Sequence, residues 1–177
     1  MIKLFDGDKE LNQDLFPLDN FSLYGITMDG ITFKTGEHAF QYLKFIGFND
    51  KIANKVLNAD TPLDARNIAI ENKKSRNPNW KDIKYDCMLN IFKLKAEQNP
   101  IVKETLLKTG NYTIIEMCED EDTDWGVDKN LQGENNLGKL WMKVRDELVG
   151  GTIVLTSCGL RNDELKERFY SVVSKEE

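Results

Sequence analysis

A run of capped helical patterns between Thr35 and Gly110 constrains the fold of this chain more than any other feature. Five patterns follow one another, and their expected starts carry capping or first-turn residues: Thr35, Asp50, Thr61, Asn79 and Asn99-Pro100. Apolar residues recur at helical spacing after each start, and Gly110 ends the last pattern. A sixth helical pattern covers residues 137–148. We therefore predict that helix dominates the fold.

A β-hairpin is expected just before these helices. Residues 26–28 and 31–33 alternate apolar and polar around Asp29-Gly30, a dipeptide that accepts the positive φ of a tight turn. Residues 112–117 have the pattern of a further strand. We predict a fold of mainly α class with a small antiparallel β-sheet.

The length of 177 residues fits one domain. We predict that residues 1–149 form it. Residues 150–177 are expected to add a strand at Thr152–Thr156 and a helix at Asp163–Val173. This appendage packs on the same domain, because it is too short to bury a core of its own.

Charge and cysteine content narrow the class of protein. The 24 basic and 30 acidic residues give a net charge of −6, which disfavours an extended nucleic-acid interface. The three cysteines are scattered and odd in number, which favours free thiols in a reducing compartment. No stretch has the pattern of a signal peptide or the apolar length of a membrane span. We predict a cytoplasmic protein without membrane partners.

Three motifs that suggest metal or nucleotide chemistry fail on inspection. Residues 133–140 nearly match a phosphate-binding loop, but Leu140 lacks the hydroxyl that binds magnesium. The alternating aspartates of residues 120–124 resemble a calcium loop, but Leu131 stands where that loop needs glutamate. His38 is the only histidine, so a histidine-rich zinc site is excluded. We predict no metal ion and no cofactor.

A polar face on the first predicted helix is a candidate site. Glu37, Gln41 and Lys44 are spaced i, i+4 and i+7, which places them on one helix face. The alternative is a solvated face, in which the glutamate only gains from the helix dipole.

Two tryptophans lie among polar residues. Trp80 and Trp125 suit stacking on a base, although a loop can also place a tryptophan in a core. Asp124 directly precedes Trp125 and supplies a second candidate carboxylate in addition to Glu37. Cleavage of an N-glycosidic bond develops positive charge on the ribose, which one carboxylate stabilises while another activates water.

An ordered series of motifs resembles the YbiA/NADAR family over residues 20–148. Its members include Asp19-Asn20-Phe21, Met28-Asp29-Gly30, Gly36–Gln41, Lys44-Phe45, Lys74-Ser75-Arg76, Trp80, Gln98-Asn99-Pro100, Asp124-Trp125-Gly126 and Asn135–Gly138, and it is their order rather than any single motif that is specific. The resemblance implies a mainly helical fold with a small sheet and N-glycosidase activity on ribosylated substrates. Asp19 departs from the family pattern, which usually has serine there, and this affects the identity of the substrate.

Site residues follow from this resemblance together with the residue patterns. We predict Glu37 and Asp124 as catalytic. The residues predicted to bind substrate are Asn20, Gln41, Lys44, Arg76, Trp80, Trp125 and Asn136. Among them, Lys44 and Arg76 are basic positions suited to a phosphate.

Three functions remain open at this point. The first is hydrolysis of a small phosphorylated ribosyl compound, such as an early intermediate of riboflavin synthesis. The second is removal of ADP-ribose from a modified base or protein. The third is a non-catalytic module that binds ADP-ribose or a nucleotide, which the two carboxylates disfavour because an anionic ligand gains nothing from them.

Overall fold

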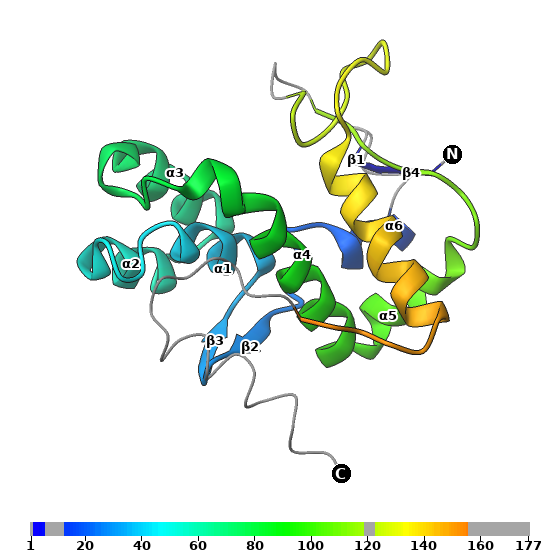
Figure 1. The fold of residues 1–177 in the computed structure, drawn as a ribbon, viewed down its shortest axis with the longest axis horizontal. Coiled ribbons are helices and arrows are strands. Elements are labelled where there is room, and N and C mark those ends of the chain that lie inside the picture. The colour runs from blue at the N-terminus through cyan, green and yellow to red at the C-terminus, as the bar shows by residue number, and fades with distance from the viewer. Residues whose placement is uncertain (1, 6–12, 119–122, 156–177) are drawn as a thin grey trace.

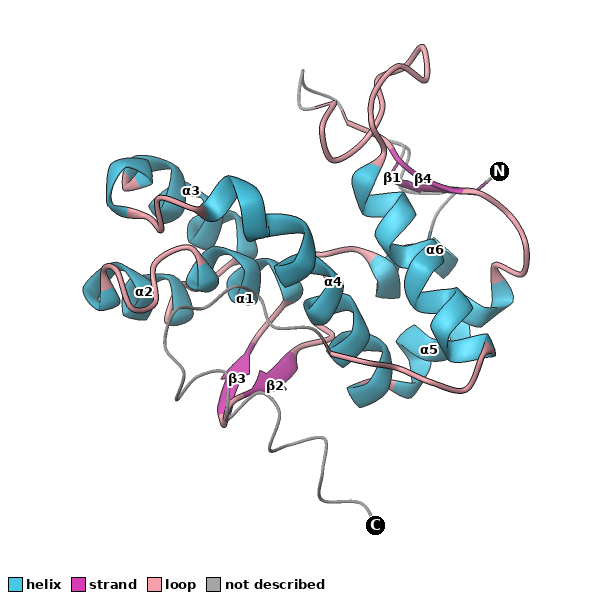
Figure 2. Ribbon diagram, viewed as in Figure 1, coloured by secondary structure: helices cyan, strands magenta, loops and turns pink. Residues whose placement is uncertain are grey.

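The computed structural model describes residues 2–5, 13–118 and 123–155, and helices dominate it (Figures 1 and 2). The helices are η1 (Gln13–Leu18), α1 (Gly36–Leu43), α2 (Asp50–Leu57), α3 (Pro62–Glu71), η2 (Lys73–Ser75), α4 (Trp80–Gln98), α5 (Pro100–Lys108) and α6 (Asn136–Val149). The strands are β1 (Ile2–Phe5), β2 (Ile26–Met28), β3 (Ile31–Phe33) and β4 (Ile114–Glu116). The predicted mainly α, single-domain fold is confirmed.

Local capping explains where most helices begin. The hydroxyl of Thr35 accepts a hydrogen bond from the backbone N–H of His38 at the start of α1. Thr61 and Asp64 form a reciprocal capping box at the start of α3. The expected cap of α2 is wrong by one residue, because Asn49 rather than Asp50 accepts the first backbone hydrogen bond.

Two separate two-stranded sheets are present in the described residues. β2 and β3 form the predicted antiparallel hairpin, and Asp29 and Gly30 at its turn have φ of 52° and 75°. β1 pairs with β4 in parallel, which was not predicted. A parallel pair joins segments far apart in the chain, so no local turn signal announces it.

The strand predicted at the start of the C-terminal appendage is wrong over Thr152–Leu155, which has no regular structure. This stretch is held by other contacts instead: the Lys93 ammonium donates a hydrogen bond to the backbone oxygen of Val154, and Lys93 forms a 2.7 Å ion pair with Glu147. The predicted helix at Asp163–Val173 lies outside the described residues.

The long helix α4 organises the core. It runs through the middle of the molecule, with α1, α2 and α3 on one side and α5, α6 and β4 on the other (Figure 1). Phe92 of α4 and Trp141 of α6 stack with ring centroids 4.0 Å apart. None of the helices described is long and apolar enough to cross a membrane.

Candidate active site

The polar face of α1 is buried, so its interpretation as a solvated face is wrong. Glu37 is 7% exposed and Gln41 is 4% exposed. Asn20 Nδ2 donates to Glu37 Oε2 at 2.6 Å, and Gln41 Nε2 donates to Glu37 Oε1 at 2.7 Å. Burial raises the pKa of Glu37 against the opposing effects of Gln41, Lys44, Arg66 and Asn20. A buried carboxyl group is thus fixed at both oxygens, and its raised pKa makes it a better proton acceptor than an exposed glutamate.

Lys44 lies at the end of α1, close to this carboxylate. Its Nζ is 5.0 Å from the ring centroid of Phe40 and 5.7 Å from that of Trp80. Burial lowers the pKa of Lys44 to about 8; the charge of Glu37 opposes this effect, and nearby Arg76, Arg66 and Lys84 add to it. Several cations therefore converge beside Glu37, which suits a phosphorylated ligand.

Aromatic rings form a continuous edge-to-face series along the site. Phe40 contacts Trp80 with centroids 5.0 Å apart and Trp125 with centroids 5.4 Å apart. Tyr85 contacts Trp125 at 5.2 Å. Trp80 is only 3% exposed and belongs to the core, whereas Trp125 is half-buried. The geometry thus favours Trp125 over Trp80 for stacking on a base.

Asp124 is held by three side chains. Lys84 forms an ion pair with it, and the Tyr85 hydroxyl donates to Oδ1 at 2.5 Å. Asn136 Nδ2 donates to the backbone oxygen of Asp124 at 2.8 Å and to Oδ1 at 3.3 Å. Burial pushes the pKa of Asp124 upward, but the hydrogen bonds from Lys84, Tyr85 and Asn136 outweigh it and leave the pKa below its usual value. Asp124 therefore stays ionised at neutral pH and is a weak proton acceptor.

The structure brings the predicted site residues into one neighbourhood. Asn20 and Gln41 hold Glu37, and Asn136 and Trp125 lie around Asp124. Lys84 joins the two groups, because it pairs with Asp124 and its charge also lowers the pKa of Lys44. The amide of Asn20 donates to Glu37, and the amide of Asn136 donates to Asp124.

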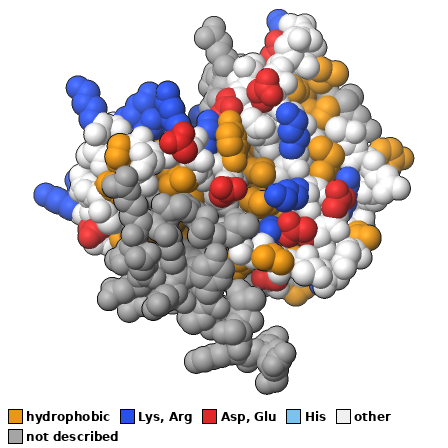
Figure 3. Space-filling view, in the orientation of Figure 1, with side chains coloured by type: hydrophobic (Ala, Val, Ile, Leu, Met, Phe, Trp, Pro, Cys, Tyr) orange, Lys and Arg blue, Asp and Glu red, His pale blue; other side chains and the backbone are white. Residues whose placement is uncertain are grey.

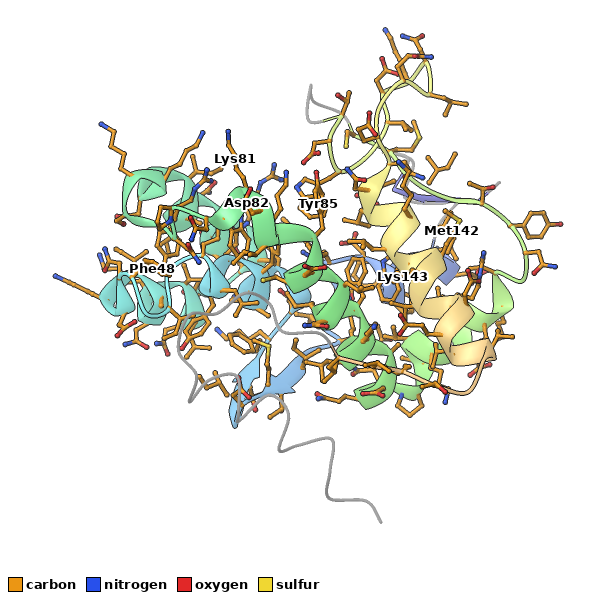
Figure 4. All side chains as sticks on the ribbon, viewed as in Figure 1. Phe48, Lys81, Asp82, Tyr85, Met142 and Lys143 are labelled. Atoms are coloured by element: carbon orange, nitrogen blue, oxygen red, sulfur yellow. The ribbon has the colours of Figure 1, made fainter. Side chains whose placement is uncertain are left out.

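Arg66, Lys84 and Tyr85 also lie at the site, and the sequence analysis did not predict them. Lys84 follows Trp80 by one helical turn, and this i, i+4 spacing is a signal that could have found it. Tyr85 points from α4 toward the loop that leads into α6 (Figure 4). Arg66 comes near Glu37 only because α3 packs against α1. Lys and Arg side chains gather on the surface over α3 and the start of α4 (Figure 3).

The single histidine has a structural role. His38 Nδ1 lies 2.8 Å from the Thr35 hydroxyl, and Nε2 lies 3.2 Å from the backbone oxygen of Ala59. Burial lowers the pKa of His38. Within residues 2–5, 13–118 and 123–155, no group of three or more His, Cys, Asp or Glu side chains is placed to hold a metal ion.

Gly36 gives a first prediction for the site. A methyl group at Gly36 would lie 2.2 Å from Asn20 Oδ1 and overlap with it. Gly36→Ala is expected to displace Asn20 and release one oxygen of Glu37, which lowers kcat by about 10- to 100-fold for one lost hydrogen bond to a charged group. Steady-state kinetics and a melting curve measure this effect.

Gly150→Ala is the matched control for Gly36→Ala. Gly150 has an ordinary helical φ of −73° and tight but tolerable neighbours at the end of α6, so this variant should keep wild-type kcat. A Gly36→Ala protein with unchanged kcat would show that Asn20 does not support Glu37.

The fold and the site define a mainly helical domain in which a clamped carboxylate is surrounded by cations and aromatic rings. The chain belongs to the NADAR domain family, whose model matches residues 9–149. It is 31% identical over 137 residues to N-glycosidase YbiA of Shigella boydii serotype 4 (strain Sb227), covering 77% of this chain and 84% of that protein. The family resemblance expected from the motifs is confirmed.

Two further relatives extend the comparison. The NMR structure of Escherichia coli YbiA superposes with a TM-score of 0.73 at 28% identity, covering 85% of each chain. A riboflavin biosynthesis protein of Vibrio vulnificus (strain YJ016) is 32% identical over 131 residues, which cover 74% of this chain and 35% of that protein.

Proposed function

We propose that this protein is an N-glycosidase that hydrolyses the bond between a ribose phosphate and a base, in a small compound such as an early intermediate of riboflavin synthesis. The observation that carries the proposal is the buried Glu37 carboxylate, held at both oxygens beside Lys44. The names of the relatives, N-glycosidase and riboflavin biosynthesis protein, support the same chemistry.

The proposed reaction uses Glu37 at the anomeric carbon. The C1–N bond breaks and its electron pair leaves with the base, while the positive charge that develops on the ribose is stabilised by the carboxylate. A water oxygen forms the new bond to C1. Glu37 accepts the proton of this water, and the departing base takes up a proton from solvent.

Asp124 has a different role in this proposal. Because it is ionised and engaged by Lys84 and Tyr85, it orients those two side chains rather than activating water. Lys44, Arg76 and Arg66 bind the phosphate, and the half-buried ring of Trp125 stacks on the base.

Removal of ADP-ribose from a base or protein is the second candidate. It is favoured by the number of cations near Glu37, since Lys44, Arg66, Arg76 and Lys84 exceed what one phosphate requires. A non-catalytic module that binds ADP-ribose is the third, and Glu37 disfavours it because the binding of an anionic ligand gains nothing from a buried carboxylate.

One assay separates these functions. Purified protein is incubated with a phosphorylated ribosyl intermediate of riboflavin synthesis, with ADP-ribosylated DNA and with ADP-ribosylated protein, and the released base or ADP-ribose is followed by chromatography. The proposal expects the highest kcat/KM on the small intermediate. Release only from a macromolecule would replace it by the second candidate, and binding without release by the third.

Arg76→Ala is expected to raise KM by about 10- to 100-fold and to change kcat less. A phosphate far from the broken bond is bound about equally in the ground and transition states, so its loss appears in KM. Steady-state kinetics measure both constants. Lys55→Ala, an exposed change on α2, is the control and should keep both. A variant in which kcat falls and KM does not would place Arg76 at the reaction centre instead.

Turnover is expected to survive exhaustive treatment with EDTA. The charge that develops on the ribose is positive, so carboxylates stabilise it directly and a metal ion beside it would repel it. Lysine and arginine side chains bind the phosphate, which removes the need for a bridging cation. Activity is measured before and after chelation. Loss that magnesium or zinc restores would contradict both the metal-free reaction and these phosphate contacts.

A further inference from the structure

Gln41 carries a buried hydrogen-bond acceptor that the described residues leave unused. Its Nε2 donates to Glu37 Oε1 at 2.7 Å, but its Oε1 has no partner in this part of the chain. The residue is only 4% exposed. Buried carbonyl oxygens are nearly always hydrogen-bonded in folded proteins, and an unsatisfied one destabilises the fold. An acceptor left open beside the proposed catalytic carboxylate needs a donor, and a hydroxyl of the ligand can supply it.

The orientation of this amide follows from its neighbour. If the amide were reversed, its oxygen would lie against an oxygen of the Glu37 carboxyl group, and two acceptors would face each other. The nitrogen therefore faces Glu37 and the oxygen faces away. Lys44 is not the missing donor, because its Nζ lies over the rings of Phe40 and Trp80.

Asn20 has a similar unused oxygen, but a different setting. Its Nδ2 donates to Glu37 Oε2, and its Oδ1 is also without a partner among the residues described. That oxygen lies against Gly36, where even a methyl group would not fit. Both oxygens are buried, but Asn20 Oδ1 is already packed against Gly36, so we take Gln41 Oε1 as the acceptor that meets a ligand group.

We infer that Gln41 Oε1 accepts a hydrogen bond from the ribose 2′-hydroxyl, so that the site selects ribosyl over 2′-deoxyribosyl substrates. The inference rests on the proposed function, in which Glu37 faces the anomeric carbon. The 2′-hydroxyl is bonded to the ring carbon next to the anomeric carbon. In the same way, the amide of Gln41 lies next to the carboxyl group of Glu37, with Nε2 2.7 Å from Glu37 Oε1. A site built to bind a hydroxyl rejects the analogue that lacks it, because its buried acceptor then stays unpaired.

The experiment compares two substrates that differ only at the 2′ position, a ribosyl and a 2′-deoxyribosyl phosphate with the same base. The kcat/KM ratio of the two is measured for wild type, Gln41→Met and Asn20→Leu. Gln41→Met keeps the length of the side chain but removes the acceptor. A general loss of activity, which follows when Glu37 loses a hydrogen-bond donor, lowers kcat/KM for both substrates and leaves their ratio unchanged. The intrinsic lability of the deoxyribosyl bond is the same for every variant, so it does not affect the comparison of ratios.

Gln41→Met is expected to lower the ribosyl preference by about 10- to 100-fold, the range for one buried hydrogen bond to a substrate. Asn20→Leu removes the other donor to Glu37 and should lower activity on both substrates while keeping the wild-type ratio. An unchanged ratio in Gln41→Met, or an equal change in both variants, would overturn the inference and leave the N-glycosidase proposal intact.

Binding of the sugar products separates the two proposals further. Calorimetry with ribose 5-phosphate and 2-deoxyribose 5-phosphate does not depend on turnover. Wild-type protein is expected to prefer ribose 5-phosphate, and Gln41→Met to lose that preference. Protein that cleaves neither ribosyl compound but keeps this preference would overturn the proposed function alone. Equal affinity of the wild type for both sugars would overturn the inference, as expected if Gln41 binds only water.

Discussion

Glu37→Gln is expected to lower kcat by about 10²- to 10⁴-fold, the range for loss of a positioned acid or base. The change removes the charge that stabilises the ribosyl cation and the base that takes the water proton. Substrate affinity should change little, since the cations that bind the phosphate remain. Single-turnover kinetics and calorimetry of the ribosyl substrate measure the two effects separately.

The fold of Glu37→Gln should persist for a specific reason. The new amide nitrogen would face the Nε2 of Gln41, but the Gln41 amide can rotate and offer its unused oxygen as an acceptor. A melting temperature close to wild type is therefore expected. Glu71→Gln, an exposed change at the end of α3, is the control for loss of one negative charge. Near-normal kcat in Glu37→Gln would remove Glu37 from the reaction.

Trp80→Ala is expected to lower the free energy of unfolding by about 3–5 kcal/mol, the usual loss when a large buried aromatic is truncated. Trp80 is 3% exposed, and its ring meets Phe40 edge-to-face with centroids 5.0 Å apart. The substitution would also remove the aromatic ring that lies beside Lys44, whose Nζ is 5.7 Å from the ring centroid. Urea denaturation followed by far-UV circular dichroism measures the change.

Trp80→Phe is the matched variant, because it keeps an aromatic ring in the same space and should lose less stability. Affinity for the ribosyl substrate is measured on the same samples. A Trp80→Ala protein of nearly normal stability that has lost its affinity would show that Trp80 stacks on the base, as the sequence alone also allowed. The burial of the ring leads us to expect the opposite outcome.

The helices were largely predictable because their signals are local. Thr61 and Asp64 cap α3 from within one turn, and Asp29-Gly30 defines the hairpin turn from within two residues. The strand β1 was missed because its partner β4 lies about a hundred residues further along the chain. The wrong strand at Thr152–Leu155 had the right composition, but no strand among the described residues pairs with it.

The candidate site was predictable only in part. Its residue types and its family resemblance made Glu37 and Lys44 candidates, but the same spacing also fitted a solvated face. Arg66 carried no signal, because its nearness to Glu37 depends on the packing of α3 against α1. The proposed division into catalytic and positioning roles also needed the hydrogen bonds. They show that the Asp124 carboxylate is bound by Lys84 and Tyr85.

The sequence by itself determined the helical class, the hairpin, the family and the central carboxylate. Caps, turns and apolar spacing act over a few residues, so they can be interpreted without coordinates. Only the tertiary structure decided what each side chain binds. Asn20 reaches Glu37 across 17 positions and Lys84 reaches Asp124 across 40. Contacts over such separations form when helices pack together, and packing depends on the whole core rather than on any one segment.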